Sequence, residues 1–270
     1  MFLRWAGSKR QLRYEMEECW LLANPSPRSV YFEAFMGSAS LFFHLVPRRA
    51  ILSDLNAKLV ECFEQVKSAP DAVAREMLTL KNTPDNYYRV RAQDETLLAP
   101  ETRAARFIYL NRYCFNGLYR TNKSGRFNVP YGGGRTGALP GFDELLTASM
   151  MLTDSKFVCS DFESVIRRYA RCGDFIYLDP PYAKQNESLD MQYGPDNFGM
   201  RDLRRLADTL SHLDALGASF LVSYADCAEA REHLGIWPSR KVWVNRSIAA
   251  NVNARVKAGE LLISNVRGWA

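Results

Sequence analysis

The sequence predicts an α/β fold, a doubly wound and mostly parallel sheet of the Rossmann-like type with an inserted lobe. Short apolar runs alternate along the chain with amphipathic helical patterns, as expected of a parallel sheet with helices on both faces. The 270 residues, 47% of them hydrophobic, can bury one large core and still form a lobe. The charged fraction of 24% is that of a globular protein and argues against disordered and fibrous classes.

Five short apolar runs are the expected strands, because such runs are typical of strands buried on both faces of a sheet. They cover residues 30–33, 50–53, 157–160, 175–178 and 219–223. Helical patterns follow at residues 57–66, 162–169 and 202–213. The part between the second and third strands interrupts this alternation. We therefore predict a sheet domain made of residues 1–56 and 150–270, with a lobe of helices and a Gly-rich hairpin inserted at 57–149.

Cysteine and histidine usage limits the chemistry. The six cysteines form no C-x-x-C pair, which indicates reduced thiols in a cytoplasmic protein. The three histidines are isolated in the sequence, which argues against a histidine metal site and against Ser-His-Asp hydrolysis. No apolar stretch reaches the roughly 18 residues that a membrane span needs. The sequence thus predicts a cytoplasmic protein with no membrane span and no resident metal.

The positive charge is concentrated in one segment. Residues 103–135 hold seven basic side chains and no acid, so the rest of this chain of net charge +5 carries a net charge of −2. Seven aromatic residues are interleaved with these cations, and a nucleic-acid surface combines cations for phosphates with flat faces for bases. Alternatively, the aromatics are core residues and the cations a solvated rim. We favour this second interpretation for Phe107 and Tyr109 in the helical run 102–113, and nucleic-acid contact for the hairpin 120–135.

Polar residues follow the first three strands, where the carboxyl ends of a parallel sheet bind ligands. After the first strand, residues 33–40 form a turn of small residues that lets a nucleoside approach the backbone. Asp54 follows the second strand, 17 residues after Gly37, which is close to the spacing at which an acid reaches a ribose hydroxyl. Asp54 or Asn56 could instead cap the next helix, and Asp161 after the third strand could equally be a cap or a ligand.

The tetrapeptide Asp179-Pro180-Pro181-Tyr182 follows the fourth strand and is the most informative motif. Two prolines stiffen the backbone and remove two donors, so that carbonyls are left as acceptors. The Asp179 carboxylate and the Pro180 carbonyl can accept hydrogen bonds from an amino group, while the Tyr182 ring offers a stacking face. A rigid structural turn is the alternative. The position at the end of a buried strand favours a pocket for the exocyclic amine of a planar heterocycle.

These motifs, in this order, resemble the Dam-type (alpha-class) DNA adenine-N6 methyltransferases over nearly the whole chain. An N-terminal motif, a cofactor turn, an acid after the second strand, a recognition lobe, Asp-Pro-Pro-Tyr and a closing strand are all present. They lie at residues 2–10, 35–37, 54–56, 109–130, 179–182 and 259–265. Ser8 and Ala39 replace glycines that are common in the family. Thr121 and Ser124 depart from the residues of members that read GATC, so GATC specificity does not follow.

The resemblance implies that the sheet domain is an S-adenosylmethionine-dependent methyltransferase domain and that the lobe recognises the target in double-stranded DNA. The implied cofactor residues are Trp5, Ala6, Lys9, Phe35, Gly37, Asp54, Asp161, Phe162 and Asp179. The implied catalytic residues are Asp179, Pro180, Pro181 and Tyr182. The expected DNA-binding residues, drawn from the recognition lobe, are Arg112, Asn116, Arg120, Asn122, Lys123 and Arg126.

The expected reaction is methyl transfer from S-adenosylmethionine to N6 of an adenine flipped out of duplex DNA, because N6 cannot be reached within the stack. Two alternatives stay open: an RNA adenine-N6 methyltransferase, and a nucleic-acid-binding protein with a decayed cofactor pocket, the latter motivated by Ser8 and Ala39. The expected setting is a prokaryotic or phage-infected cell. The sequence leaves open a cognate restriction or defence partner and does not identify the recognition site.

Overall fold

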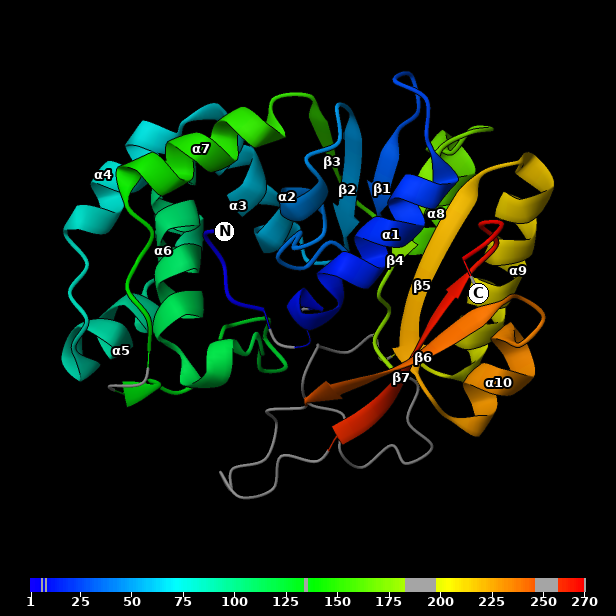
Figure 1. Cartoon of the computed structure of the whole chain (residues 1–270). Coiled ribbons are helices and arrows are strands. Elements are labelled where there is room, and N and C mark those ends of the chain that lie inside the picture. Colours follow the sequence, from blue (N-terminus) through cyan, green and yellow to red (C-terminus); the bar gives the residue numbers. More distant parts are fainter. Residues whose placement is uncertain (6, 8, 134–135, 183–197, 246–256, 270) are drawn as a thin grey trace.

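The computed structural model describes residues 1–5, 7, 9–133, 136–182, 198–245 and 257–269. Within these residues a seven-stranded sheet forms the centre of the molecule, and the helical lobe lies to one side of it (Figure 1). The strands are β1 (Tyr31–Glu33), β2 (Ala50–Asp54), β3 (Ser155–Cys159), β4 (Phe175–Leu178), β5 (Ser219–Ala225), β6 (Ser239–Asn245) and β7 (Lys257–Ser264). The doubly wound α/β class predicted from the sequence is confirmed.

The strand order is β3-β2-β1-β4-β5-β7-β6. The first five strands run parallel, while β7 is antiparallel to both β5 and β6. All five predicted strands are present within two residues of their expected ends. The sequence analysis did not predict β6, an edge strand in which the apolar residues 242–244 follow three polar residues and in which Trp243 is 60% exposed.

Helices follow the strands in the expected rhythm, and the predicted helices correspond to α3, α8 and α9. The helices are α1 (Arg13–Ala23), α2 (Phe42–Leu45), α3 (Ala57–Ser68), α4 (Pro70–Leu78), α5 (Pro84–Ala92), α6 (Pro100–Tyr113), α7 (Phe142–Leu152), α8 (Phe162–Tyr169), α9 (Met200–Leu216) and α10 (Ala228–Leu234). Short 3-10 turns occur at Arg10–Leu12, Glu95–Leu97 and Phe115–Gly117. No helix in the described ranges is long and apolar enough to cross a membrane.

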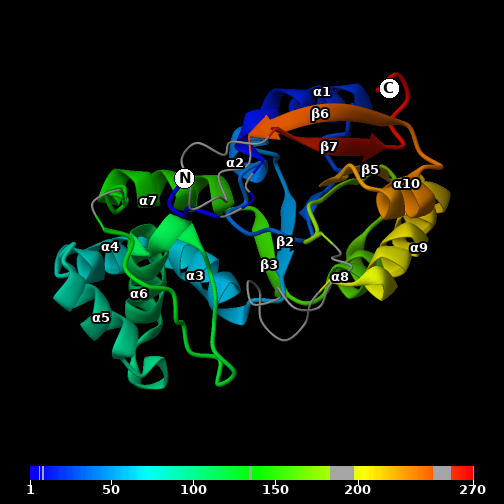
Figure 2. The same cartoon turned by 90° about the horizontal axis from the view of Figure 1, so that it is seen from below.

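The sheet separates two hydrophobic cores. Successive strand residues point to opposite faces, so Tyr31 packs with residues of α1, α2 and α3, whereas Phe32 packs with residues of α8, α9 and α10. Figure 2 shows the same arrangement from below, with α1 and α2 on one side of the strands and α8 and α9 on the other. Because both faces are covered, the free carboxyl ends of the strands are the place left for a ligand.

The lobe has a small core of its own, formed mainly by α5, α6 and the segment after α6. Phe107 and Tyr109 are both buried, which confirms the core interpretation for these two aromatics. The hairpin is a tight loop in which Thr121 pairs with Phe127 across a single bridge. The division at 57 and 149 stays a prediction. Its second limit falls inside α7, and α3 contributes to the core under the sheet.

Candidate active site

The corner that follows β4 lies where the strand order reverses, between β1 and β4. Ligands of doubly wound sheets bind in the crevice at this point. Glu33 at the end of β1 pairs in register with Tyr177 of β4, so the two strands bring Glu33 close to Asp179 at the same edge. The motif at residues 179–182 therefore lies at the position where doubly wound sheets bind their ligands.

Asp179 is held by two hydrogen bonds to one of its oxygens. Lys9 Nζ lies 2.6 Å from Oδ1, and the Ser223 hydroxyl donates to the same oxygen at 2.8 Å. The Tyr177 hydroxyl lies 3.3 Å from Ser223 Oγ and continues this network into the sheet. The second oxygen, Oδ2, accepts no hydrogen bond from the part of the chain that the structure describes. The side chain is 20% exposed, so this carboxylate is fixed in direction and still reachable.

Lys9 is a buried cation between two carboxylates. Its Nζ lies 2.6 Å from Asp179 Oδ1 and 3.3 Å from Glu260 Oε1, and it donates to the Gly7 carbonyl at 3.1 Å. Burial acts to lower the pKa of Lys9, but the negative charge of Asp179, supported by Tyr182, Tyr177 and Glu260, outweighs it and raises this pKa well above its ordinary value. Lys9 is therefore protonated at neutral pH.

Tyr182 is the last residue of the corner at 179–182. Its ring packs edge-on against Tyr224, with centroids 5.5 Å apart, and Lys9 Nζ lies 5.5 Å from the Tyr182 ring centroid. Burial is the main cause that raises the pKa of Tyr182 to about 12, so the phenol is neutral. Pro180 is buried and Pro181 is partly exposed. The aromatic face is thus supported from behind by another ring.

The turn after β1 fits closely against the N-terminal segment. Gly37 has φ +46, and a Cβ at this position would lie 2.8 Å from Trp5 Cδ1, so only glycine is accommodated. Gly37 N donates to Asp54 Oδ2 at 3.1 Å and Asn56 N donates to Asp54 Oδ1 at 2.9 Å. Asn56, and not Asp54, caps α3 through the amides of Lys58 and Leu59. The predicted acid Asp54 therefore holds the turn, and burial raises its pKa.

At the end of β3, the structure shows Asp161 as the cap of α8. Its carboxylate accepts from the amides of Glu163 and Ser164 and pairs with Arg205 at 2.8 Å. Burial acts to raise the pKa of Asp161, but the Ser164 hydrogen bonds and Arg205 outweigh it and lower this pKa. Phe162 is buried, and its ring stacks on Phe35 with centroids 5.3 Å apart. The cofactor role of these three residues stays a prediction, as does that of Ala6, which lies outside the described residues.

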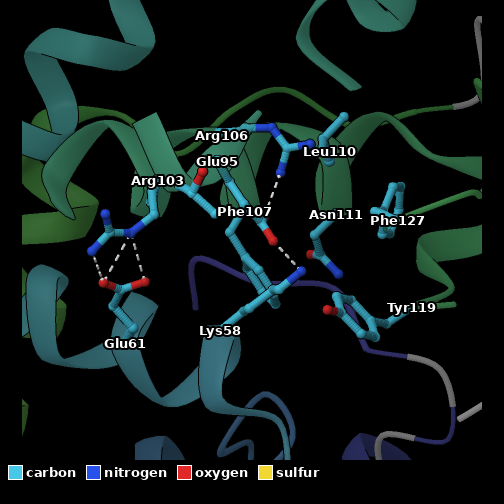
Figure 3. A pocket seen from close by; sticks show the side chains of 11 residues that line it. Lys58, Glu61, Glu95, Arg103, Arg106, Phe107, Leu110, Asn111, Tyr119 and Phe127 are labelled. Atoms are coloured by element: carbon cyan, nitrogen blue, oxygen red, sulfur yellow. Dashed lines mark hydrogen bonds and ion pairs between the residues drawn. The ribbon is translucent and has the colours of Figure 1, made fainter. Parts of the chain in front are cut away.

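The segment after α6 contacts the turn after β1 through Trp5. The Tyr119 and Trp5 rings are stacked with centroids 5.9 Å apart, and Tyr119 also packs on Phe107 and Phe127. Beside Tyr119 lies a pocket of about 250 Å³ between α3 and α6 (Figure 3).

An ion-pair network crosses this pocket and reaches the hairpin. Figure 3 shows Glu95 between Lys58 and Arg106. Arg106 Nη1 lies 3.1 Å from Glu95 Oε2. Lys58 also donates to the Gly125 carbonyl at 3.0 Å, and this bond ties the hairpin to the start of α3.

The predicted DNA-binding residues lie together around the end of α6 and the hairpin, and they differ in exposure. Asn116, Asn122, Lys123 and Arg126 are exposed. Asn122 Oδ1 accepts from the Ser124 and Arg126 amides and shapes the tip. Arg120 Nε donates to Asn128 Oδ1 at 2.8 Å, and Arg112 Nε donates to the Ala138 carbonyl at 2.9 Å, so both partly serve the fold. Lys123 and Arg126 are the exposed cations of this set, and their contact with DNA stays a prediction.

Sequence reasoning missed three residues of this corner, namely Glu33, Ser223 and Glu260. All three are at most 2% exposed. An ionisable residue within an apolar strand was the available signal, because burying an acid is costly unless it is paired. Glu260 in the run Gly259-Glu260-Leu261-Leu262 shows that signal clearly, and Glu33 at the end of β1 shows it too.

The fold is of the doubly wound class, whose members bind ligands at the switch point of the sheet, and the corner with Asp179 and Tyr182 lies at that point. Over residues 5–242 the chain matches the family model for D12 class N6 adenine-specific DNA methyltransferase, and it belongs to that family. It is therefore an S-adenosylmethionine-dependent enzyme that methylates adenine N6 in DNA, as its resemblance to the Dam-type family implies.

Curated relatives match over most of the chain. The DNA adenine methylase of Haemophilus influenzae is 34% identical, with 97% of this chain and 92% of the relative covered. Type II methyltransferase M1.LlaDCHI of Lactococcus lactis subsp. cremoris is 32% identical, with coverage of 98% and 94%. Type II methyltransferase M.MjaIII of Methanocaldococcus jannaschii is 33% identical, with coverage of 82% and 83%.

Proposed function

We propose that this enzyme extrudes an adenine from duplex DNA and holds its amino group at the corner formed by residues 179–182. The observation that carries the proposal is the state of Asp179. Lys9 and Ser223 bond to Oδ1, and Oδ2, which accepts no hydrogen bond from the described residues, accepts one from the incoming amine. The Pro180 carbonyl is the second acceptor, and Tyr182 offers the stacking face. The base must leave the stack because N6 is otherwise out of reach.

The corner favours transfer by directing the nitrogen lone pair. In adenine this pair is delocalised into the ring. Hydrogen bonds from the two amine hydrogens to Asp179 and to the Pro180 carbonyl localise it on N6 and aim it along one line, while Tyr182 holds the ring in place. S-adenosylmethionine supplies a methyl group on a positively charged sulfur. A directed carboxylate beside a cation in a partly desolvated site also stabilises charge as it develops.

Three features support a cofactor site next to this corner. Gly37 leaves room where any Cβ would meet Trp5, so the turn and the indole form one surface. Asp54 accepts one amide on each carboxylate oxygen and retains further acceptor capacity toward ribose hydroxyls. The stacked Phe35 and Phe162 rings provide an apolar wall for a base. These residue types fit a nucleoside carrying a cationic sulfur.

The hairpin is the proposed DNA contact. Lys123 and Arg126 are exposed on a rigid turn, and Lys58 holds that turn against α3. Two relatives are named type II methyltransferases, which supports a cognate restriction partner. We also place the enzyme in the cytoplasm, where bacterial DNA is found.

A transfer assay tests the proposal. The protein is incubated with methyl-labelled S-adenosylmethionine and, in parallel, duplex DNA, single-stranded DNA and structured RNA, and the products are digested to nucleosides. We expect label as N6-methyladenine in duplex DNA, and sequencing of that DNA reports the recognition site. Label confined to RNA supports the RNA alternative, whereas no transfer and no heat on titration with S-adenosylmethionine supports a binding-only protein.

A further inference from the structure

We infer that Asn111 and Tyr119, two residues of the lobe, are positioning residues for the cofactor site, because they hold the segment that carries Trp5. The inference rests on the proposed cofactor site beside Gly37, of which the Trp5 indole is one wall. Every cofactor residue implied by the resemblance lies in the predicted sheet domain. Asn111 and Tyr119 give the lobe a second role, apart from its proposed contact with DNA.

Asn111 is hydrogen-bonded to the backbone of the residue before Trp5. It lies on α6 and is 2% exposed. Arg4 N donates to Asn111 Oδ1 at 2.8 Å, and Asn111 Nδ2 donates to the Arg4 carbonyl at 2.6 Å. Because one amide side chain supplies both an acceptor and a donor, Asn111 satisfies both backbone groups of Arg4, as a paired strand residue would. A leucine or an aspartate at position 111 cannot make this pair.

Tyr119 holds the indole itself. Its ring is stacked on that of Trp5, with centroids 5.9 Å apart and an interplanar angle of 19°. Tyr119 also packs on Phe107 and Phe127, with centroids 5.5 and 5.6 Å apart. Asn111 and Tyr119 both line the pocket between α3 and α6 (Figure 3). The stack therefore joins Trp5 to α6 through Phe107 and to the hairpin through Phe127.

The segment fits tightly between the lobe and the turn after β1. Gly117, after α6, has φ +64, and a Cβ there would lie 3.0 Å from Arg4 Cβ. A Cβ at Gly37 would meet the five-membered ring of Trp5, at 2.8 Å from Cδ1 and 2.9 Å from Nε1. Trp5 thus contacts the lobe and the turn at once. Because the fit at Gly37 is tight, a change in the orientation of the indole alters the surface that the turn offers to the cofactor.

The segment has a separate anchor in the core under the sheet. Phe2 is 1% exposed and packs on Phe43 and Phe63, with centroids 6.1 and 4.9 Å apart. A change at either lobe residue therefore leaves the segment attached and alters only the part around the indole.

The test measures binding of S-adenosylmethionine to the full-length protein by calorimetry. Tyr119→Leu removes the ring face, and we expect its dissociation constant to rise about fivefold, whereas Tyr119→Phe keeps the face and should stay within about twofold of the wild type. Asn111→Leu leaves the Arg4 amide and carbonyl unpaired and should weaken binding about tenfold. Transfer kinetics should show the same rise in KM for the cofactor, with kcat within about twofold of the wild type, since Asp179 and Tyr182 are unchanged.

Tyr109→Leu is the matched control. Tyr109 lies on the same helix, α6, but packs on Tyr87 and Tyr113 in the lobe core. Its replacement loosens the lobe and leaves the Trp5 stack intact. The dissociation constant of this variant should therefore stay within about twofold of the wild type.

Three results overturn the inference: unchanged binding in Tyr119→Leu and Asn111→Leu, equal weakening in Tyr109→Leu, or a fall in kcat with no change in KM. If circular dichroism shows that a variant is unfolded, Tyr119→Met or Asn111→Asp replaces it with the same expected direction. A wild type that binds no S-adenosylmethionine overturns the proposed function as well. A wild type that binds it, beside variants that bind it equally well, overturns this inference alone.

Discussion

The corner after β4 and the hairpin around residues 121–127 both contain charged residues, but these residues are buried and paired in the corner and exposed on the hairpin. In the corner, Lys9 is 8% exposed and Glu260 1% exposed, and each is paired. On the hairpin, Lys123 and Arg126 are exposed and form no ion pair within the described ranges. The geometry of a buried ion pair is fixed before a ligand binds. An exposed cation instead releases water and counterions when it binds a phosphate. The corner should therefore control chemistry, and the hairpin affinity and its salt dependence.

The largest expected effect is at Asp179. Asp179→Ala removes the proposed acceptor for the N6 amine, and we expect the rate constant for methyl transfer to fall at least about a hundredfold, within the range of general acid–base contributions. The affinity for DNA should change by less than about tenfold, because the hairpin is untouched. Single-turnover transfer and a DNA-binding titration measure the two quantities. A variant that keeps more than about a tenth of wild-type turnover contradicts the mechanism.

The next largest effect is expected in the pH dependence of the free energy of unfolding, which depends on the burial of Glu33. The pKa of Glu33 is raised from 4.5 to about 8, mainly by burial, so between these pH values the native state holds a proton that the unfolded chain has lost. The free energy of unfolding of the wild type should therefore fall relative to Glu33→Gln as the pH rises through this window, by up to about 1.4 kcal/mol per pH unit. Urea denaturation of both proteins at several pH values measures this difference. A wild-type free energy of unfolding that stays constant or rises relative to that of Glu33→Gln across this window would show that Glu33 is ionised in the fold.

Two glycines give a matched comparison of the regions, since both have positive φ, +46 at Gly37 and +72 at Gly125. Gly125→Ala meets no atom within 4 Å and should cost only the backbone strain of about 1 to 2 kcal/mol. Gly37→Ala adds a contact at 2.8 Å with Trp5 and should cost more. Thermal unfolding with and without S-adenosylmethionine measures the stability of both variants and its change on cofactor binding. We expect the cofactor to stabilise Gly125→Ala as it does the wild type, and Gly37→Ala less.

The smallest effect is expected at the hairpin cations. Lys123→Gln and Arg126→Gln should each weaken DNA binding by less than about tenfold at moderate salt, and each should reduce the slope of log affinity against log salt by about 0.9 where it removes a phosphate contact. Filter or fluorescence titrations over a salt series measure the slope. Arg75→Gln on α4, where the arginine pairs with Asp71, is the control and should leave the slope unchanged. A variant that weakens only one DNA sequence would instead identify a base-reading residue.

Much of the fold could be predicted because its signals are local. An apolar run such as β4 specifies a buried strand by itself, and Asp179 to Tyr182 could be placed at the sheet edge because they directly follow it. The alternatives at Asp54 and Asn56 could not be resolved in this way, since both residues can cap a helix. The structure shows that Asn56 caps α3, whereas Asp54 accepts a hydrogen bond from Gly37, which is 17 residues away.

The residues that complete the corner could not be predicted because their partners are remote in sequence. Lys9 meets Asp179 across 170 positions and Ser223 meets it across 44. The position of Glu260 depends on the register of an antiparallel strand, and a shift by one residue would turn its side chain to the other face. Neither the pairing partner nor the register of β7 follows from its composition.

The ion pair between Lys9 and Glu260 has a consequence for folding of the protein during its translation. The hairpin is translated in the first half of the described chain, but the acid that completes the buried cluster emerges from the ribosome only with β7. A nascent chain that ends before β7 therefore lacks one of the two carboxylates that lie beside Lys9. The buried cluster forms only after residues from the two distant ends of the described chain have come together.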